Sequence, residues 1–388
     1  MVKFAHLSDI HLGGWRQQPL QELNILSFKT AIDLCIKERV DFVIISGDLF
    51  DSAFPPIDIL KEAFSIFKKL SDSRIPCFLI AGSHDYSVSG KTFIDVLEKA
   101  GFCENVAKFE EIGGRIILNP TIYKGTAIYG YPGKTANLEI EDLKRAEFND
   151  APGLFKIFVI HTTIDKARGD LPINFIETER LPYADYYACG HLHIDFQYEN
   201  FVYPGPIFPN NFQELEDLEH GRFCIIDSSK NKFGWIKKVP LKIKEVALFN
   251  VEVENASLAT EKIISEMEKR DIKDKIVLLR LRGELKFGKT SDIKFDKIED
   301  NLKKMGAYFF LKNSNELKSE EPVLDINVEE TEDIEGDIIK NYSEQNESPL
   351  NKYIFQLINA LSIEKQEGET TEGFIKRLTE ESRKVLNF

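Results

Sequence analysis

The stretch "KFAHLSDIHLG" at residues 3–13 joins a short apolar run to an aspartate and a histidine. The run has the length of a buried strand, and Asp9 and His11 follow where such a strand would end. Further runs rich in Val, Ile, Phe and Tyr predict buried strands at 40–46, 75–81, 154–161 and 183–190. Amphipathic patterns at 20–38 and 57–70 predict helices between the first three strands. This order predicts βαβ units in a mostly parallel α/β sheet, with a mixed or second sheet from later strands.

The pattern changes after the α/β region, which we place at 1–240. Residues 244–316 run strand, helix, strand, helix, strand and predict a small α+β domain. An acidic segment at 317–347 is interpreted as a linker with room for partial order. Two amphipathic helices follow within 348–388. A helix pair beyond a charged linker has little core to join, so we favour docking to a partner over folding back on the chain.

Composition narrows the class of protein. A chain of 388 residues with 43% hydrophobic residues suggests two or three domains. No apolar run approaches the ~20 residues that a membrane span needs, and the first residues show no signal-peptide pattern. Five scattered cysteines without a CxxC pair are best interpreted as buried free thiols. We therefore expect a cytoplasmic or nucleoid-associated protein.

The net charge of −14 is unevenly distributed. Eleven acidic residues and one basic residue lie between Glu320 and Glu347, so the other 360 residues carry a net charge of only −4. The acidity therefore belongs mainly to one segment and does not exclude phosphate binding elsewhere.

Side chains suited to metal binding follow the predicted strands of the α/β region. The chain has seven histidines, and five of them stand at strand ends. With two aspartates in similar places, the set is Asp9, His11, Asp48, His84, His161, His191 and His193. Because the carboxyl ends of strands in open α/β sheets meet at one crevice, we expect these side chains to share a pocket.

Such a pocket would hold metal, because several carboxylates repel each other without a cation between them. Carboxylate and imidazole ligands suit Mn, Fe or Zn, and their number exceeds what one tetrahedral ion needs. Two ions about 3.5–4 Å apart, bridged by one carboxylate, fit better and serve displacement at phosphorus. Each motif alone is weak, since a histidine at a strand end is usually just hydrogen-bonded. The ordered set D-x-H, GD, G-x-HD, H and GHxH is a strong indication of metal.

The stretches that carry these motifs are "KFAHLSDIHLG", "VDFVIISGDLFDS", "IAGSHD", "GHLH" and "VYPGP". In them the chain resembles the metallophosphoesterase (calcineurin-like) superfamily, and within it the DNA double-strand-break repair nucleases of the SbcD type. The resemblance is close over 1–240 and extends further only as architecture. It implies a two-sheet α/β/β/α sandwich, a capping domain, and a segment, here 348–388, that grips a coiled-coil ABC-type ATPase. It also implies a homodimer, with the helices at 20–38 and 57–70 as candidate contacts.

The same resemblance carries roles to individual positions. It implies a first metal held by Asp9, His11, Asp48 and His193. It implies a second metal held by the bridging Asp48 together with Ser83, His161 and His191. His84 matches the family's catalytic histidine, which neutralises the phosphate or protonates the leaving oxygen and is not a ligand. The implied metal is manganese, and the implied reaction is phosphodiester hydrolysis.

Two positions depart from the family pattern. Most relatives have Asn where this chain has Ser83, whose hydroxyl is a hard oxygen donor on a shorter arm. We therefore expect a working site with a weaker second metal position. Asp51 stands where many archaeal and eukaryotic relatives have histidine, and its simplest interpretation is a loop residue that caps the helix after Pro55. His6 lies inside the first strand and is interpreted as a core histidine or one that supports the ligands.

The leading hypothesis is a manganese-dependent DNA exo- and endonuclease that works with the ATPase and contacts DNA ends and backbone without reading sequence. The alternatives are a hydrolase of small phosphoesters or cyclic nucleotides, and a scaffold with a weakened site that recruits the ATPase. The extra domain and the terminal helices argue against the first alternative, and the near-complete ligand set against the second. Basic loop residues that could touch DNA phosphates are Arg16, Lys91, Lys134, Lys166 and Arg168.

Overall fold

The computed structural model describes residues 1–86, 90, 92–169, 172–230, 235–319, 351–361, 363 and 371–386. The chain divides into two compact units, Met1–Lys318 and Ser319–Phe388. The predicted acidic linker from residue 320 onward, the start of the 348–388 segment and Lys91 lie outside the described residues. In the described part of the chain, no helix combines the length and apolar character that a bilayer crossing requires.

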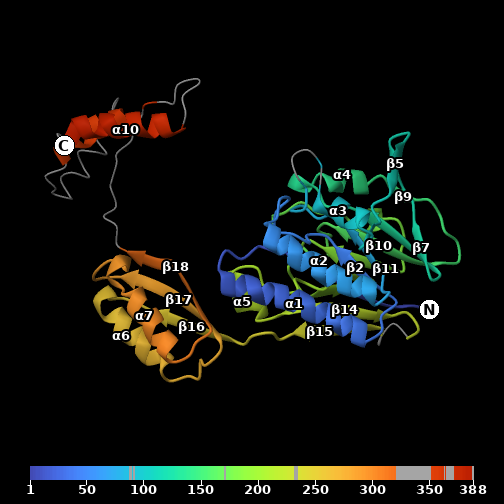
Figure 1. Ribbon diagram of the computed structural model, residues 1–388, viewed down its shortest axis with the longest axis horizontal. Coiled ribbons are helices and arrows are strands. Elements are labelled where there is room, and N and C mark those ends of the chain that lie inside the picture. Colours follow the sequence, from blue (N-terminus) through green and yellow to red (C-terminus); the bar gives the residue numbers. More distant parts are fainter. Residues whose placement is uncertain are drawn as a thin grey trace. The chain divides into compact units, whose positions relative to one another are not determined.

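Two six-stranded sheets form the body of the first unit (Figure 1). The first sheet has the order β15 (Ile236–Leu241), β14 (Gly221–Asp227), β1 (Lys3–Leu7), β2 (Phe42–Ser46), β3 (Cys77–Ile80) and β4 (Glu104–Asn105). The second has the order β12 (Phe196–Tyr198), β13 (Phe201–Tyr203), β11 (Tyr186–Gly190), β10 (Phe155–His161), β8 (Thr126–Tyr131) and β7 (Thr121–Tyr123). Strands β1 to β4 are parallel, as are β8, β10, β11 and β13, and antiparallel pairs close the edges.

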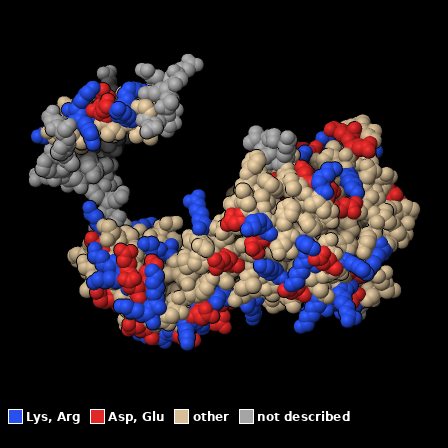
Figure 2. Space-filling view, in the orientation of Figure 1, with Lys and Arg blue, Asp and Glu red and all other residues tan. Residues whose placement is uncertain are grey.

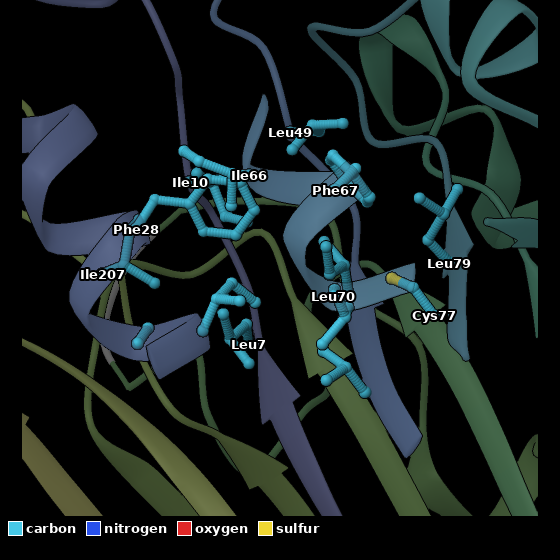
Figure 3. Close-up of a cluster of buried hydrophobic side chains, with 14 of the residues drawn as sticks. Leu7, Ile10, Phe28, Leu49, Ile66, Phe67, Leu70, Cys77, Leu79 and Ile207 are labelled. Carbon is cyan, nitrogen blue, oxygen red and sulfur yellow. The ribbon is translucent and has the colours of Figure 1, made fainter. Parts of the chain in front are cut away.

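The predicted sandwich is confirmed, and its layers follow from burial on alternate strand positions. Phe4, Ile44, Val159 and Ala188 belong to the core between the two sheets. On the outer face of the first sheet, the helices α1 (Gln18–Lys37) and α2 (Ile57–Asp72) cover a second core, in which Phe28 and Phe67 meet edge-to-face (Figure 3).

The outer face of the second sheet is covered differently. The short helix α4 (Glu139–Leu143) and a three-stranded sheet of β5 (Phe109–Ile112), β6 (Arg115–Leu118) and β9 (Ala146–Phe148) pack there. The later strands that the sequence could not assign therefore distribute over three sheets. The other helices of this part are α3 (Phe93–Lys99) and α5 (Phe212–Leu218).

The predicted elements of the small α+β region are all present. They are β16 (Val246–Glu252), α6 (Ala256–Met267), β17 (Ile276–Leu285), α7 (Phe295–Lys304) and β18 (Phe309–Ser319). They enclose a core of their own, and Ile276 and Leu278 of β17 also pack with Leu20 and Leu215. In the second unit, α9 (Ile354–Leu361) and α10 (Thr371–Leu386) are the two expected helices and lie in contact.

Candidate metal centre

The predicted site residues lie at the carboxyl ends of strands from both large sheets. The first sheet supplies the residues after β1, β2 and β3, which are Asp9, His11, Asp48, Ser83 and His84. The second supplies those at the ends of β10 and β11, which are His161, His191 and His193. The site is therefore shared by two sheets, whereas the sequence did not show which strands belong to which sheet.

Six of these side chains come close enough to share cations. Among the described residues, three groups each have ligand atoms within 4.8 Å of one another: Asp9, His11 and His193; His11, Asp48 and His84; and Asp9, Asp48 and His161. The Nε2 atoms of two histidines, His11 and His193, lie 3.0 Å apart. Asp48 Oδ2 lies 3.1 Å from His161 Nε2 and 3.6 Å from His11 Nε2. Asp48 thus belongs to two of the three groups, as a bridging carboxylate would.

The backbone is strained where the strands turn into the site. Asp9, His11 and Asp48 have φ angles of 50°, 45° and 49°, and His191 has 91°. Few residues other than glycine adopt positive φ, and such strain concentrates at functional sites. At Gly190, a Cβ would collide with the Ser46 carbonyl, so only glycine lets β11 approach the end of β2 this closely.

Three imidazoles are oriented with Nε2 facing the centre. In each, Nδ1 lies next to an oxygen that can only accept, so Nδ1 carries a proton and Nε2 is the nitrogen that can bind a cation once it has lost its own proton. These acceptors are the Ser46 carbonyl for His161 (2.9 Å), Glu214 Oε1 for His193 (2.8 Å) and Asp51 Oδ1 for His11 (3.2 Å). Metal-binding histidines are commonly held in this way, because the second hydrogen bond fixes the ring and makes Nε2 more basic.

Two polar atoms at the centre are buried without a hydrogen-bond partner: Asp9 Oδ2 and His161 Nε2. The His161 atom is near Asp48 Oδ2, but the angles do not make a hydrogen bond. Leaving such groups unsatisfied costs about 1–3 kcal/mol each. A divalent cation would satisfy both, because a carboxylate oxygen and an imidazole nitrogen are ligands that Mn, Fe and Zn accept. The residues therefore fit a metal.

The electrostatics also favour positive charge here. Burial lowers the pKa of His161, but the negative charge of Asp48 outweighs it and raises the pKa to about 10. Burial likewise lowers the pKa of His193, but the hydrogen bond to Glu214 outweighs it and raises the pKa to about 9. Burial raises the pKa of Asp48, yet the neighbouring imidazoles, His161 above all, hold that pKa well below its ordinary range. A metal ion can supply the same positive charge in place of protons.

The other three predicted residues are His84, which also belongs to one of the three groups, His191 and Ser83. His84 is exposed, its ring packs edge-on to His11, and its Nδ1–H donates to the Asp51 carbonyl at 3.0 Å, which leaves Nε2 free of that bond. The His191 N–H donates to Asp9 Oδ1 at 2.9 Å, and burial lowers the pKa of its ring to about 4. Ser83 is half-buried in the loop that touches Asp48, since the His84 N–H donates to Asp48 Oδ1 at 2.9 Å.

Asp85 organises the loops although it faces no ligand position. This fully buried carboxylate accepts backbone N–H groups from Leu49, Phe50 and Gly82 at 3.2, 3.0 and 2.9 Å. It ties the loop after β2 to the loop after β3, which carry Asp48 and His84. Burial, aided by the nearby charge of Asp48, raises the pKa of Asp85 to about 6.

The structure corrects one prediction and confirms another. Asp51 does not cap α2, whose first turn has no side-chain cap, but accepts from His11 Nδ1 instead. The expectation failed because the carboxylate turns inward to the imidazole. His6 is fully buried between Ser46 and Tyr186, as a core histidine should be.

Sequence reasoning missed the supports on the segment before and within α5. Glu214 orients His193 and also accepts the Asn210 backbone N–H at 2.7 Å. The Asn210 side chain donates to Asp51 Oδ1 at 3.3 Å, so the same segment supports the carboxylate that orients His11. A glutamate in a run of acidic residues gave no local signal of this role.

The chain is similar to several known proteins. The chain is 25% identical over 312 residues to a DNA double-strand break repair protein Mre11 from Archaeoglobus fulgidus, covering 73% of this chain and 68% of that protein. The Mre11 of Sulfolobus acidocaldarius is 26% identical over 360 residues, with 88% and 90% covered. A metallophosphoesterase of Bacillus subtilis, YhaO, is 27% identical over 237 residues, with 57% and 55% covered. A solved archaeal phosphodiesterase aligns with 61% of this chain and 99% of its own at a TM-score of 0.30 and 11% identity.

The calcineurin-like phosphoesterase family, whose members use divalent metals, matches residues 2–195. That match spans half of the chain and contains all eight predicted site residues. The chain therefore belongs to the calcineurin-like phosphoesterase family.

Proposed function

We propose that this phosphoesterase is a manganese-dependent DNA nuclease that holds two cations. The observation that carries the proposal is the convergence of oriented ligand atoms that lack hydrogen-bond partners, at Asp9 Oδ2 and His161 Nε2, beside the paired Nε2 atoms of His11 and His193. Asp9, His11, Asp48 and His193 would hold the first cation. Asp48, Ser83, His161 and His191 would hold the second, and the short arm of Ser83 would make it the weaker.

When bound, two cations stabilise charge on the attacking and leaving oxygens of a phosphodiester. The chain itself contributes by positioning the groups that take part in the reaction. Asp85 holds the loops that carry Asp48 and His84 in register. His84, with Nδ1–H on a carbonyl and Nε2 directed elsewhere, can neutralise the phosphate or deliver a proton to the leaving oxygen.

DNA is favoured as the substrate by the relatives, because archaeal proteins that are similar to this chain are named for DNA double-strand break repair. The distribution of surface charge supports a DNA substrate less strongly. Figure 2 shows Lys and Arg interspersed with Asp and Glu over the face in view. Lys134 pairs with Asp142 and Lys166 with Asp165, so each lysine would exchange an acidic partner for a DNA phosphate. The described part of the face in view therefore offers no broad basic surface for DNA.

A coiled-coil ABC-type ATPase is the proposed partner of the second unit. The helices α9 and α10 leave the apolar side chains of Leu361 and Ile375 exposed by 55% and 56%, as a helix pair that docks elsewhere would. Co-purification of the ATPase with the full chain, and its loss on truncation after residue 345, tests this. Retention by the truncated chain would contradict it.

A homodimer through α1 and α2 is the proposed assembly. Leu26 and Ile57 on these helices are exposed by 47% and 78%. Ile57→Glu should shift the chain from dimer to monomer in light scattering. Val96→Glu, at a 47% exposed position on α3, is the matched control and should leave the mass unchanged.

The decisive experiment is a nuclease assay on labelled linear duplex DNA, after chelation and with manganese or magnesium added back. His84→Ala should slow cleavage about 100-fold or more, as loss of a general acid does, without changing manganese affinity. His220→Ala, a histidine remote from the site residues in sequence, is the control. Equal cleavage by wild type and His84→Ala would refute the mechanism. Activity on an aryl phosphodiester but not on DNA would point to a small phosphoester substrate.

A further inference from the structure

Arg280 on β17 is a buried cation whose contacts are concentrated on one short helix. Its residue surface is 5% exposed. Its Nε lies 2.9 Å from Glu216 Oε2, its Nη2 binds the same carboxylate, and Nη2 also donates to Gln213 Oε1 at 2.7 Å. Nη1 donates to Glu316 Oε1 at 2.7 Å. The guanidinium also faces the Phe212 ring at 5.2 Å, so three residues of α5 meet this one side chain.

The same helix supports the metal centre through its other contacts. Glu214, between the Arg280 contacts Gln213 and Glu216, accepts from His193 Nδ1. It also accepts the Asn210 N–H just before the helix. The helix α5 therefore contacts both the small α+β region and a candidate ligand within four successive residues, 213–216.

The helix α5 is held by the buried Leu215, which packs with Ile276 and Leu278, and by the polar contacts of Arg280, which fix its direction. The helix has seven residues, and helices this short are marginal on their own, since they owe their stability to tertiary contacts. Its N-cap, Asn211, secures the first turn through the Glu214 N–H at 2.9 Å. The last turn of α5 is held by the hydrogen bonds from Arg280 to Glu216. A guanidinium that donates two parallel hydrogen bonds fixes a carboxylate in direction as well as in distance.

We propose that Arg280 is a positioning residue for the metal centre: it holds α5 so that Glu214 keeps His193 Nε2 aimed at the first cation. The small α+β region thereby contributes to metal affinity, although none of the proposed ligands lies in it. This inference rests on the proposed function, since it assumes that His193 binds metal.

The test is titration of the full chain with Mn²⁺, after chelation, by isothermal calorimetry. Loss of a group that supports a metal ligand typically weakens metal binding 10- to 100-fold, so Arg280→Met should raise the dissociation constant of the tighter site about tenfold. Arg282→Met is the matched control. Arg282 lies two residues along the same strand and pairs with Glu316 at 2.9 Å, its side chain is 51% exposed, and it should change affinity less than twofold.

A double variant tests the route through α5. Glu214→Gln should weaken binding by itself, and Arg280→Met should add little in that background, because both changes act on the same imidazole. Should Arg280→Met not fold, Glu216→Gln takes its place, with the same direction expected.

The outcomes separate the two proposals. If the wild type binds no Mn²⁺, the metal centre and the inference fail together. If the wild type binds but Arg280→Met binds equally well, only the inference fails. Equal weakening by Arg280→Met and Arg282→Met, or additive weakening in the double variant, would overturn the specific route through Glu214.

Discussion

The buried side chain of His6 makes the free energy of unfolding depend on pH, and the size of this dependence can be calculated. Burial lowers the pKa of His6 from 6.5 to about 3, since the ring is enclosed between the sheets. Its two nitrogens contact the Tyr186 hydroxyl at 2.8 Å and the Ser46 hydroxyl at 2.9 Å, which suits a neutral imidazole. The folded protein thus keeps His6 uncharged at a pH where the unfolded chain binds a proton.

The direction in which the free energy of unfolding changes with pH follows from proton binding. Below pH 6.5 the unfolded state takes up a proton that the folded state refuses, so stability is lost as the pH falls from 6.5 toward 3. Each unit of pKa difference corresponds to about 1.4 kcal/mol. Between pH 7 and pH 5, His6 alone should therefore remove about 2 kcal/mol from the free energy of unfolding.

The perturbation is His6→Gln, measured by denaturant unfolding in the presence of chelator at pH 7 and pH 5. The wild-type advantage over the variant should shrink by about 2 kcal/mol at the lower pH, because the variant has no proton to gain. Tyr186→Phe is the control: it removes a hydrogen bond without removing the titrating ring, so its cost should be the same at both pH values. A wild-type advantage that does not change with pH would refute a neutral buried His6.

Three further outcomes are expected. Asp85→Ala leaves three buried N–H groups without an acceptor, and at about 1–3 kcal/mol per group it should cost at least ~3 kcal/mol in denaturant unfolding; a cost no larger than that of exposed Asp72→Ala would refute the loop tie. Mn²⁺ at 100 times its dissociation constant should add about 2.7 kcal/mol to stability, so chelation should lower the melting temperature, and identical melting curves would argue against a bound metal. Ser83→Asn should tighten the weaker of two Mn²⁺ sites, whereas two equally full sites in anomalous scattering of wild-type crystals would contradict the weakness assigned to serine.

Much of the fold was predictable because its signals are local. Buried strands such as β2 are continuous apolar runs, and α2 shows its apolar stripe in the sequence. The assignment of strands to sheets was not predictable in the same way. The strands β3 and β10 have similar composition but lie in different sheets, and only the packing of their side chains in the shared core decides this.

The candidate metal centre, too, was only partly predictable from the sequence. The candidate ligands stand in short motifs directly after strands, so their convergence could be expected from topology. The residues that orient these ligands could not be expected from the sequence. Glu214 is 21 residues from His193, and Asp51 is 40 residues from His11, so these pairs form only in the folded chain. Arg280 is 64 residues from Glu216 and resembles any other charged residue in a strand that alternates Arg and Leu.

The division of the site between two sheets sets an order of events during synthesis. His11 and His193 are 182 residues apart in the sequence. During synthesis, the candidate ligands of the first sheet are therefore made long before those of the second sheet. A ribosome-bound fragment that ends before β11 has β1 to β4 of the first sheet but not β14 and β15, and it also lacks His191 and His193. Binding of the proposed cations would therefore be a late step of maturation, after β11 and the residues that follow it have been made.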